Sequence, residues 1–245
     1  MIPLLLLAGA AASAPVNPKL MECQVLIKTD VAKAISFASQ WQIDGGGISA
    51  RECLGLAYAK AGRWQPAMTA FEQAAQIADR NQDPRAPRLW IQSGNAALAA
   101  GDANKARIAF ETALGSGKIT GTEAGEVWLD RGRALVALRD LKGARTCIDQ
   151  ALKLSPTNPL AWLLSATLAR RMEDLKRAQN DIGEAIKLAP NDPAVALEAG
   201  NIAIMSGAPE AAKTAWEAAA KLDPSGPIGA SARRALSQFG DAAKP

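Results

Sequence analysis

A repeat of 34 residues in the second half of the chain restricts its fold more than any other feature. Pro156, Pro190 and Pro224 are 34 residues apart, and the five residues before each proline agree in type: Ala-Leu-Lys-Leu-Ser, Ala-Ile-Lys-Leu-Ala and Ala-Ala-Lys-Leu-Asp. Upstream in each unit, an alanine is followed four residues later by a large apolar residue; these pairs are Ala144 and Ile148, Ala178 and Ile182, and Ala212 and Trp216. Such a period indicates stacked supersecondary units, because one unit cannot bury its apolar face alone.

Two longer units of the same kind precede these three. Each is followed by a short insertion, at residues 81–85 and near residues 120–124. Their matching residues are Leu54, Gly55, Tyr58, Gly62, Ala67, Phe71 and Ala74 in one, and Trp90, Gly94, Ala97, Gly101, Ala106, Phe110 and Ala113 in the other. Apolar residues recur three and four apart in both halves of every unit, so each half is predicted to be an amphipathic helix.

The ends of these helices are also readable. Gly62, Gly101 and Gly207 stand where the first helix of a unit must stop, and glycine accepts the left-handed conformation that ends a helix. Between units, Asn158-Pro159 and Asp192-Pro193 supply an N-cap followed by a proline at the first helical position. Each unit is therefore predicted to be a helix-turn-helix.

The pattern W-x2-L-G-x2-Y, then A-x3-F-x2-A, then P, resembles the tetratricopeptide repeat. The resemblance covers about residues 48–226 in five units, 48–81, 87–120, 125–158, 159–192 and 193–226. The departures are local, since Leu54 and Tyr58 are the only leucine and tyrosine at their positions. The resemblance implies an all-α, right-handed solenoid of helix-turn-helix hairpins with a concave inner wall. A low aromatic content of 4% and abundant alanine agree with closely packed helices.

The two ends of the array are predicted to be caps. Residues 18–47 form a divergent helical hairpin closed by three glycines at 45–47. At the other end, residues 227–239 form a short helix with a polar outer side, and residues 240–245 form a disordered tail.

Residues 1–14 resemble a secretory signal peptide. Residues 2–14 are uncharged and apolar and end in Ala12-Ser13-Ala14, while cleavage after Ala10 is a competing possibility. The segment is too short to span a bilayer, which takes about 20 residues. We therefore expect an exported, periplasmic protein, and the alternative is a cytoplasmic chain with an apolar N-terminus.

The three cysteines bear on the same question. Cys23 and Cys53 are 30 residues apart and are predicted to lie on the first helices of neighbouring hairpins. A disulfide between them is one interpretation, and two small apolar core residues are the other. Cys147 precedes the core position Ile148 and is predicted to be an inert packing residue.

The composition excludes several kinds of chemistry. The chain has no histidine, which excludes Ser-His-Asp and Cys-His catalysis, histidine-ligated zinc and a histidine pH switch. Gly115-Ser-Gly117-Lys118 lacks the glycine and the Ser or Thr that a phosphate-binding loop needs, because Thr112 and Ile119 stand there. Glu126 and Asp130 share a helix face, which we interpret as solvated. We expect no catalytic residue, no cofactor and no metal.

The net charge of +4 is small, and no run of Lys or Arg exceeds two residues. Nucleic-acid binding would need a clustered basic face, so no nucleic-acid partner is expected. No stable membrane span is expected either, and the partner is predicted to be a protein or an extended peptide.

The resemblance implies that the first helix of each unit lines the concave wall. At one equivalent position the five units carry Leu56, Asn95, Arg133, Thr167 and Asn201. Hydrogen-bonding side chains in register could hold an extended peptide, and Arg170 and Arg171 would add positive charge. These residues could also be merely solvated. The version of the family that clamps chaperone C-termini has a lysine four residues before an asparagine, whereas this chain has Ile91 and Leu197 there.

The sequence thus predicts a non-catalytic scaffold of the bacterial cell envelope that binds partners on its concave face. An alternative is an envelope assembly or maturation co-factor, as in cytochrome c maturation or outer-membrane biogenesis. A remote alternative is a carboxylate-based hydrolase of cell-wall glycan, which would need two buried carboxylates facing a pocket at about 5–9 Å separation.

Overall fold

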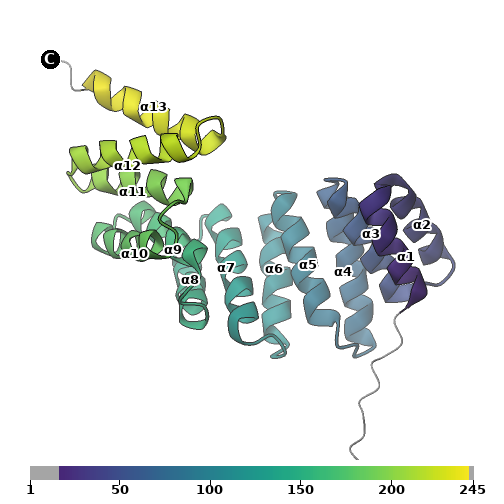
Figure 1. Ribbon diagram of the computed structural model, residues 1–245. Helices are drawn as coiled ribbons and strands as arrows, with labels where there is room; N and C mark the ends of the chain where they lie inside the picture. Colours follow the sequence, from purple (N-terminus) through teal and green to yellow (C-terminus); the bar gives the residue numbers. More distant parts are fainter. Residues whose placement is uncertain (1–16, 243–245) are drawn as a thin grey trace, which may run out of the picture.

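The computed structural model describes residues 17–242, and throughout this range the chain folds into helices, without strands (Figure 1). The helices are α1 (Pro18–Thr29), α2 (Val31–Ile43), α3 (Gly47–Lys60), α4 (Trp64–Arg80), α5 (Ala86–Ala99), α6 (Ala103–Gly115), α7 (Gly121–Ala137), α8 (Leu141–Leu154), α9 (Pro159–Arg171), α10 (Leu175–Leu188), α11 (Pro193–Met205), α12 (Pro209–Leu222) and α13 (Pro227–Ala242). The predicted all-α solenoid is confirmed.

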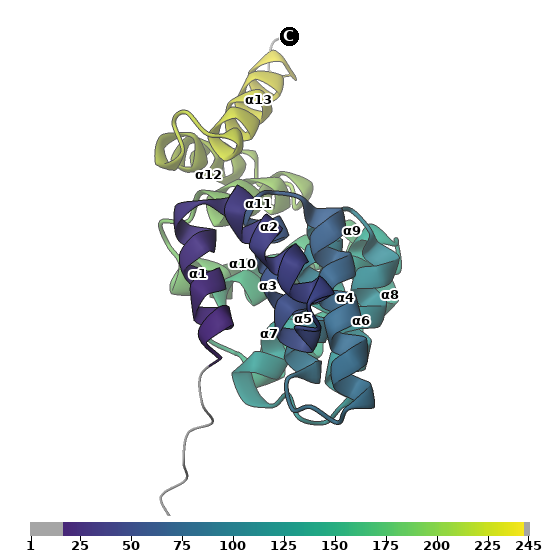
Figure 2. The same cartoon turned by 90° about the vertical axis from the view of Figure 1, so that its right-hand side faces the viewer.

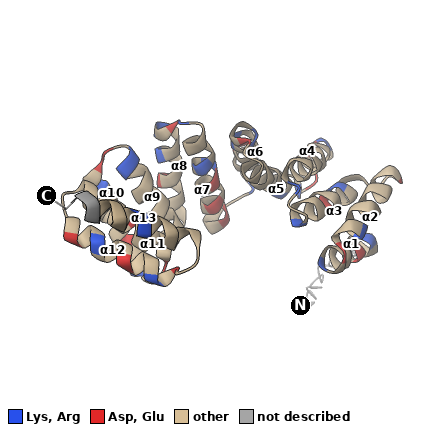
Figure 3. Cartoon of the chain, turned by 90° about the horizontal axis from the view of Figure 1, so that it is seen from above, with Lys and Arg blue, Asp and Glu red and all other residues tan. Residues whose placement is uncertain are grey.

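The helices stack as antiparallel hairpins in chain order. The five units correspond to α3–α4, α5–α6, α7–α8, α9–α10 and α11–α12. Seen from above, the stack follows an arch in which α3, α5 and α7 lie on the inner side and α4, α6 and α8 on the outer side (Figure 3). Lys and Arg are interspersed with Asp and Glu along this arch. A side view shows α12 and α13 projecting from the C-terminal end of the stack (Figure 2).

The helix termini follow the predicted signals in most units. Gly62, Gly101 and Gly207 have φ values of 69°, 79° and 75°. The Asn158 side chain accepts a hydrogen bond from the N–H of Leu160, and that of Asp192 from the N–H of Ala194. In the third and fourth units the left-handed residue is not glycine: Arg139 and Glu173 adopt φ = 62° there. Non-glycine residues in this conformation are strained.

Each hairpin is held by a close contact between two residues that are 16 apart in the sequence. The first residue, in the inner helix, is small, and the second, in the outer helix, is a large apolar residue. A Cβ atom on Gly94 would lie 2.6 Å from the ring of Phe110, so the ring packs directly on the backbone of α5. The five pairs are Gly55–Phe71, Gly94–Phe110, Gly132–Ile148, Ala166–Ile182 and Gly200–Trp216.

Alanines fill the closest contacts of the outer helices. The members of this set are all less than 2% exposed. They are Ala67, Ala74, Ala106, Ala113, Ala144, Ala151, Ala178, Ala185, Ala212 and Ala219. Small side chains here let neighbouring hairpins approach, which explains why alanine is abundant in this chain.

The N-terminal cap is joined to the first repeat by a disulfide. The structure pairs Cys23 of α1 with Cys53 of α3, with 6.1 Å between their Cα atoms, and both residues are fully buried beside Trp41. Cys147 is a buried free cysteine, and burial raises the pKa of its thiol, as suits a packing residue. Residues 1–14, the predicted signal peptide, lie outside the described residues.

At the C-terminus, α13 covers the last repeat. Ala232 is buried against the cluster formed by Trp216 and Ala219, and the Phe239 ring contacts the Trp216 ring edge-on at 6.5 Å between centroids. The helix continues to Ala242, three residues beyond the end expected at 239, so residues 240–242 are helical instead of part of a disordered tail.

The close contact in α5 yields a stability prediction. Gly94→Ala should lower the free energy of unfolding by about 1–3 kcal/mol, because the added methyl group overpacks the Phe110 ring. Gly183→Ala in α10 is the matched control, since a Cβ there meets no atom within 4 Å. The control should stabilise the protein by about 0.5–1 kcal/mol, as Ala replaces Gly inside a helix. Urea denaturation measures both, and equal effects would disprove the contact.

The disulfide yields a second prediction. Alkylation of the denatured, exported protein should add one label without reductant and three labels after reduction. A Cys147→Ala variant should add no label without reductant and two labels after reduction. Reduction should also lower the free energy of unfolding by about 3–4 kcal/mol, since the bridge closes a loop of 30 residues. Three labels without reductant would show that Cys23 and Cys53 are free.

Candidate peptide-binding groove

The predicted wall residues follow the small residue of each close contact, one position later in the inner helix. Asn95 of α5 and Arg133 of α7 are exposed, whereas Thr167 of α9 and Asn201 of α11 are half-buried. Leu56 of α3 packs partly against the core and is also half-buried. The five positions therefore differ in how much of their side chains a partner could reach.

A polar hollow lies between α5 and α7. It is lined by Asn95, Leu98, Ala99, Asp130 and Arg133. Nη1 of Arg133 donates a hydrogen bond to Oδ1 of Asp130 at 2.9 Å. Desolvation raises the pKa of the Asp130 carboxyl group. Asp130 thus lies in a hollow and not on the solvated face that we expected for it and Glu126; of the two, only Glu126 is exposed.

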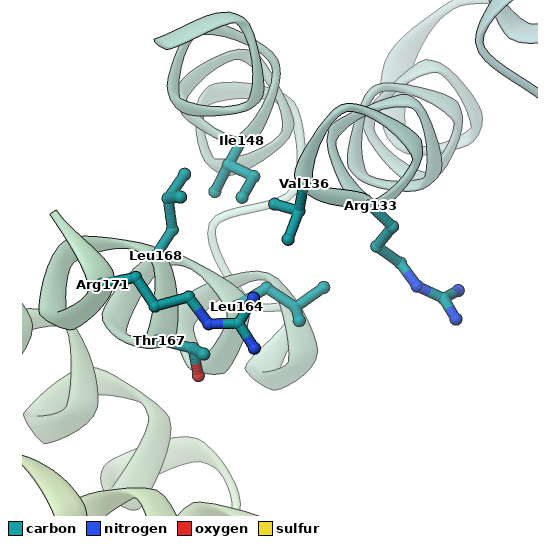
Figure 4. A pocket seen from close by; sticks show the side chains of 7 residues that line it. All are labelled: Arg133, Val136, Ile148, Leu164, Thr167, Leu168 and Arg171. Atoms are coloured by element: carbon teal, nitrogen blue, oxygen red, sulfur yellow. The ribbon is translucent and has the colours of Figure 1, made fainter. Parts of the chain in front are cut away.

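An apolar pocket adjoins this hollow between α7, α8 and α9 (Figure 4). Its volume is about 130 Å³. Four aliphatic side chains and three polar ones line it: Val136, Ile148, Leu164 and Leu168, and Arg133, Thr167 and Arg171. The Oγ1 atom of Thr167 donates to the carbonyl oxygen of Leu163, so this hydroxyl is already engaged within α9.

Arg133 lines both hollows, so the two are neighbours along three inner helices. We call the combined surface of the polar hollow and the apolar pocket the inner groove. It brings together three of the predicted site residues, Asn95, Arg133 and Thr167. The side chain of Asn95 is exposed and its amide forms no hydrogen bond with the described part of the chain, so its donor and its acceptor are available to a partner.

Arg170 and Asn201 are instead engaged inside the protein. Nε of Arg170 donates to Oε1 of Glu198 at 2.7 Å, and Nη2 donates to Oε2 at 3.2 Å. The amide of Asn201 donates to Glu198 and accepts from Nε1 of Trp216. Arg170 therefore adds no free positive charge to the wall, contrary to expectation, because the buried Glu198 compensates it.

A second polar cluster lies between α8, α9 and α10. The guanidinium of Arg145 donates to Ser165 and pairs with Asp149, and Ser165 donates to the buried Asp181. Arg177 bonds both carboxylates, Asp149 and Asp181. Burial lowers the pKa of Arg145. Every charge in this cluster has an opposite partner, which is how a protein tolerates buried charges.

Within residues 17–242, no three Cys, Asp or Glu side chains come together in a way that could hold a metal ion. None of the helices in the same range is long and apolar enough to cross a membrane.

Sequence reasoning missed most of the apolar pocket. Val136, Ile148, Leu164 and Leu168 have the apolar character of ordinary core residues, and only their positions across three helices form the pocket. One signal was available, because Ile148 stands where the first, second and fifth units carry Phe71, Phe110 and Trp216. A smaller residue at an aromatic position indicates locally missing volume.

Comparisons with known proteins agree with the repeat pattern. Two family models described as tetratricopeptide repeat match residues 125–168 and 163–227. A comparison with curated proteins gives no match.

Solved structures with a similar fold are numerous. PilW, described as a widely conserved type IV pilus biogenesis factor, matches with a TM-score of 0.71 at 15% identity, over 87% of this chain and 96% of PilW. PilF of Pseudomonas aeruginosa matches with a TM-score of 0.68 at 13% identity, over 89% of this chain and 96% of PilF.

YrrB, described as a TPR protein with an unusual peptide-binding site, matches with a TM-score of 0.58 at 16% identity, over 80% of this chain and 96% of YrrB. At these identities the likeness concerns the fold. The repeat matches, the 34-residue period and the stacked hairpins together show that this chain belongs to the tetratricopeptide-repeat family.

Proposed function

We propose that this protein is a non-catalytic scaffold that binds a protein or an extended peptide in the inner groove. The observation that carries the proposal is that the polar hollow and the apolar pocket are neighbours that share Arg133 as a lining residue. Repeat solenoids generally use their concave surfaces for such binding.

The groove offers the chemistry that a peptide backbone requires. The exposed amide of Asn95 has a donor and an acceptor, which suits a peptide N–H and C=O. Arg133 provides further N–H donors one unit along the groove, although one of its nitrogens is bonded to Asp130. The apolar pocket then receives a side chain, so backbone and side-chain recognition are available on neighbouring helices.

A location in the bacterial cell envelope is part of this proposal. The apolar segment at residues 1–14 and the pairing of Cys23 with Cys53 support export, because disulfides persist in oxidising compartments. A second candidate function is a role in envelope assembly, which is favoured by the fold resemblance to PilW, described as a pilus biogenesis factor. In that role the scaffold would hold a client for a partner.

The glycan-hydrolase alternative has weaker support. Asp149 and Asp181 line one hollow, between α8, α9 and α10. Both carboxylates accept hydrogen bonds from Arg177, and Asp149 also pairs with Arg145. Both carboxylates are thus engaged by arginine, whereas a glycosidase needs one carboxylic acid that donates its proton to the substrate.

Site-specific crosslinking in cells tests the proposed binding face. A photoreactive phenylalanine analogue at Ala99, which is exposed in the polar hollow, should give an adduct of defined mass. The same analogue at Lys142, exposed on the outer helix α8, should give none. Arg133→Ala should weaken partner binding about 10- to 100-fold, because charge-assisted hydrogen bonds are lost. Adducts at residue 142 and none at residue 99 would refute the groove.

A further inference from the structure

We propose that the apolar pocket is an anchor site for one bulky apolar side chain, of phenylalanine or leucine size, within an acidic segment of the partner. This inference rests on the proposed function and narrows its ligand class. The pocket is the one formed by α7, α8 and α9 and lined by Val136, Ile148, Leu164, Leu168, Arg133, Thr167 and Arg171.

The size of the pocket suits a single side chain. Its volume of about 130 Å³ is close to that of an apolar cavity of about 150 Å³ that binds benzene. Four aliphatic side chains supply the contacts, and the guanidinium of Arg171 lies beside Leu164 at the edge of the pocket (Figure 4). An aromatic ring or a leucine side chain therefore fits, whereas a charged side chain would be desolvated without a partner.

The pocket arises from a local departure from the repeat. In the first, second and fifth units a glycine of the inner helix faces an aromatic ring of the outer helix. In the third unit, the side chain nearest to Gly132 is that of Ile148, which is not aromatic and lines the pocket. The fourth unit also has an isoleucine, Ile182, but there Ala166 takes the place of the glycine. The third unit is thus the one in which both residues of the pair are small for their positions.

The charge at the mouth favours acidic neighbours of the anchor. Arg171 is exposed and makes no ion pair within residues 17–242, and its guanidinium lies beside Leu164 and Thr167 (Figure 4). Arg133 also lines the pocket, but its guanidinium points away from the aliphatic side chains (Figure 4) and is paired with Asp130. Arg170, the neighbour of Arg171, is bound to Glu198 and does not contribute. A carboxylate next to the anchor can therefore pair bidentately with Arg171.

Methyl NMR of the full chain with three synthetic peptides tests the anchor. The peptides are acetylated and amidated Ser-Glu-Phe-Glu-Ser, Ser-Glu-Ala-Glu-Ser and Ser-Lys-Phe-Lys-Ser. We expect the first to shift the methyl resonances of Ile148 and Leu168, with binding at least about tenfold tighter than for the other two. Equal binding of the Phe and Ala peptides, or no shift at these methyls at millimolar peptide, would overturn the proposal.

Two variants separate the pocket from the fold. Ile148→Phe should abolish binding of the first peptide, because the ring fills the pocket, and it should keep the fold, because Gly132 leaves the room that Gly94 leaves for Phe110. Arg171→Glu should weaken binding of the Ser-Glu-Phe-Glu-Ser peptide at least tenfold and should strengthen binding of the Ser-Lys-Phe-Lys-Ser peptide. Lys213→Glu on α12 is the control: it makes the same change in charge and should alter the binding of neither peptide. If Ile148→Phe fails to fold, the Arg171→Glu comparison decides.

The two proposals can fail separately. If the adduct at Ala99 forms but the Phe peptide does not bind the pocket, the groove stands and the anchor is wrong. If the adduct forms only on the outer face, the groove itself is wrong.

Discussion

The contact between a small residue of each inner helix and a large residue 16 positions later sets the geometry of every hairpin. Because Gly94 lacks a Cβ, the Phe110 ring packs on the backbone of α5, and the two helices approach more closely than two ordinary side chains would allow. Fully buried alanines such as Ala106 and Ala113 then permit the next hairpin to pack equally closely. The spacing of the inner helices, and with it the shape of the groove, follows from these contacts. Where the contact changes, at Gly132 and Ile148, the wall opens into the apolar pocket.

Polar links between units determine which inner residues are available to a partner. Arg170 of α9 bonds Glu198, a nearly buried carboxylate in α11, and so joins the two helices, while Asn201 bonds the same carboxylate within α11. Removing one member of such a buried pair is costly, because the remaining charge has no compensation. These residues therefore belong to the frame. The corresponding region of α5 and α7 has an exposed Asn95 and an Arg133 bonded only to its neighbour Asp130, so the proposed recognition surface lies in the second to fourth units.

The sequence predicted the frame well, because the frame depends on local signals that repeat. The 34-residue period located the last three hairpins and the same residue pattern located the two longer ones before them, and Asn158-Pro159 and Asp192-Pro193 marked helix starts that the structure confirms. Arg139 and Glu173 were missed, since only glycine signals a left-handed residue and these side chains tolerate it under constraint from the fold. Asp102, Asp140 and Asp174 cap the outer helices after the same turn and were missed too. The hydrogen-bond partner of Arg170 could not be predicted from the sequence, because Glu198 is 28 residues away in the next unit.

A repeat fixes the frame at the positions where its units agree, so recognition must come from the positions where they differ. The alanines of the outer helices are the same in all five units and cannot distinguish one partner from another. The position after the close contact changes from Leu56 to Asn95, Arg133, Thr167 and Asn201, and the aromatic position changes to isoleucine at Ile148. These two kinds of variation coincide in the third unit, where Arg133 and Ile148 line the same pocket. Two departures from the repeat in one unit thus bring charge and missing volume to the same place.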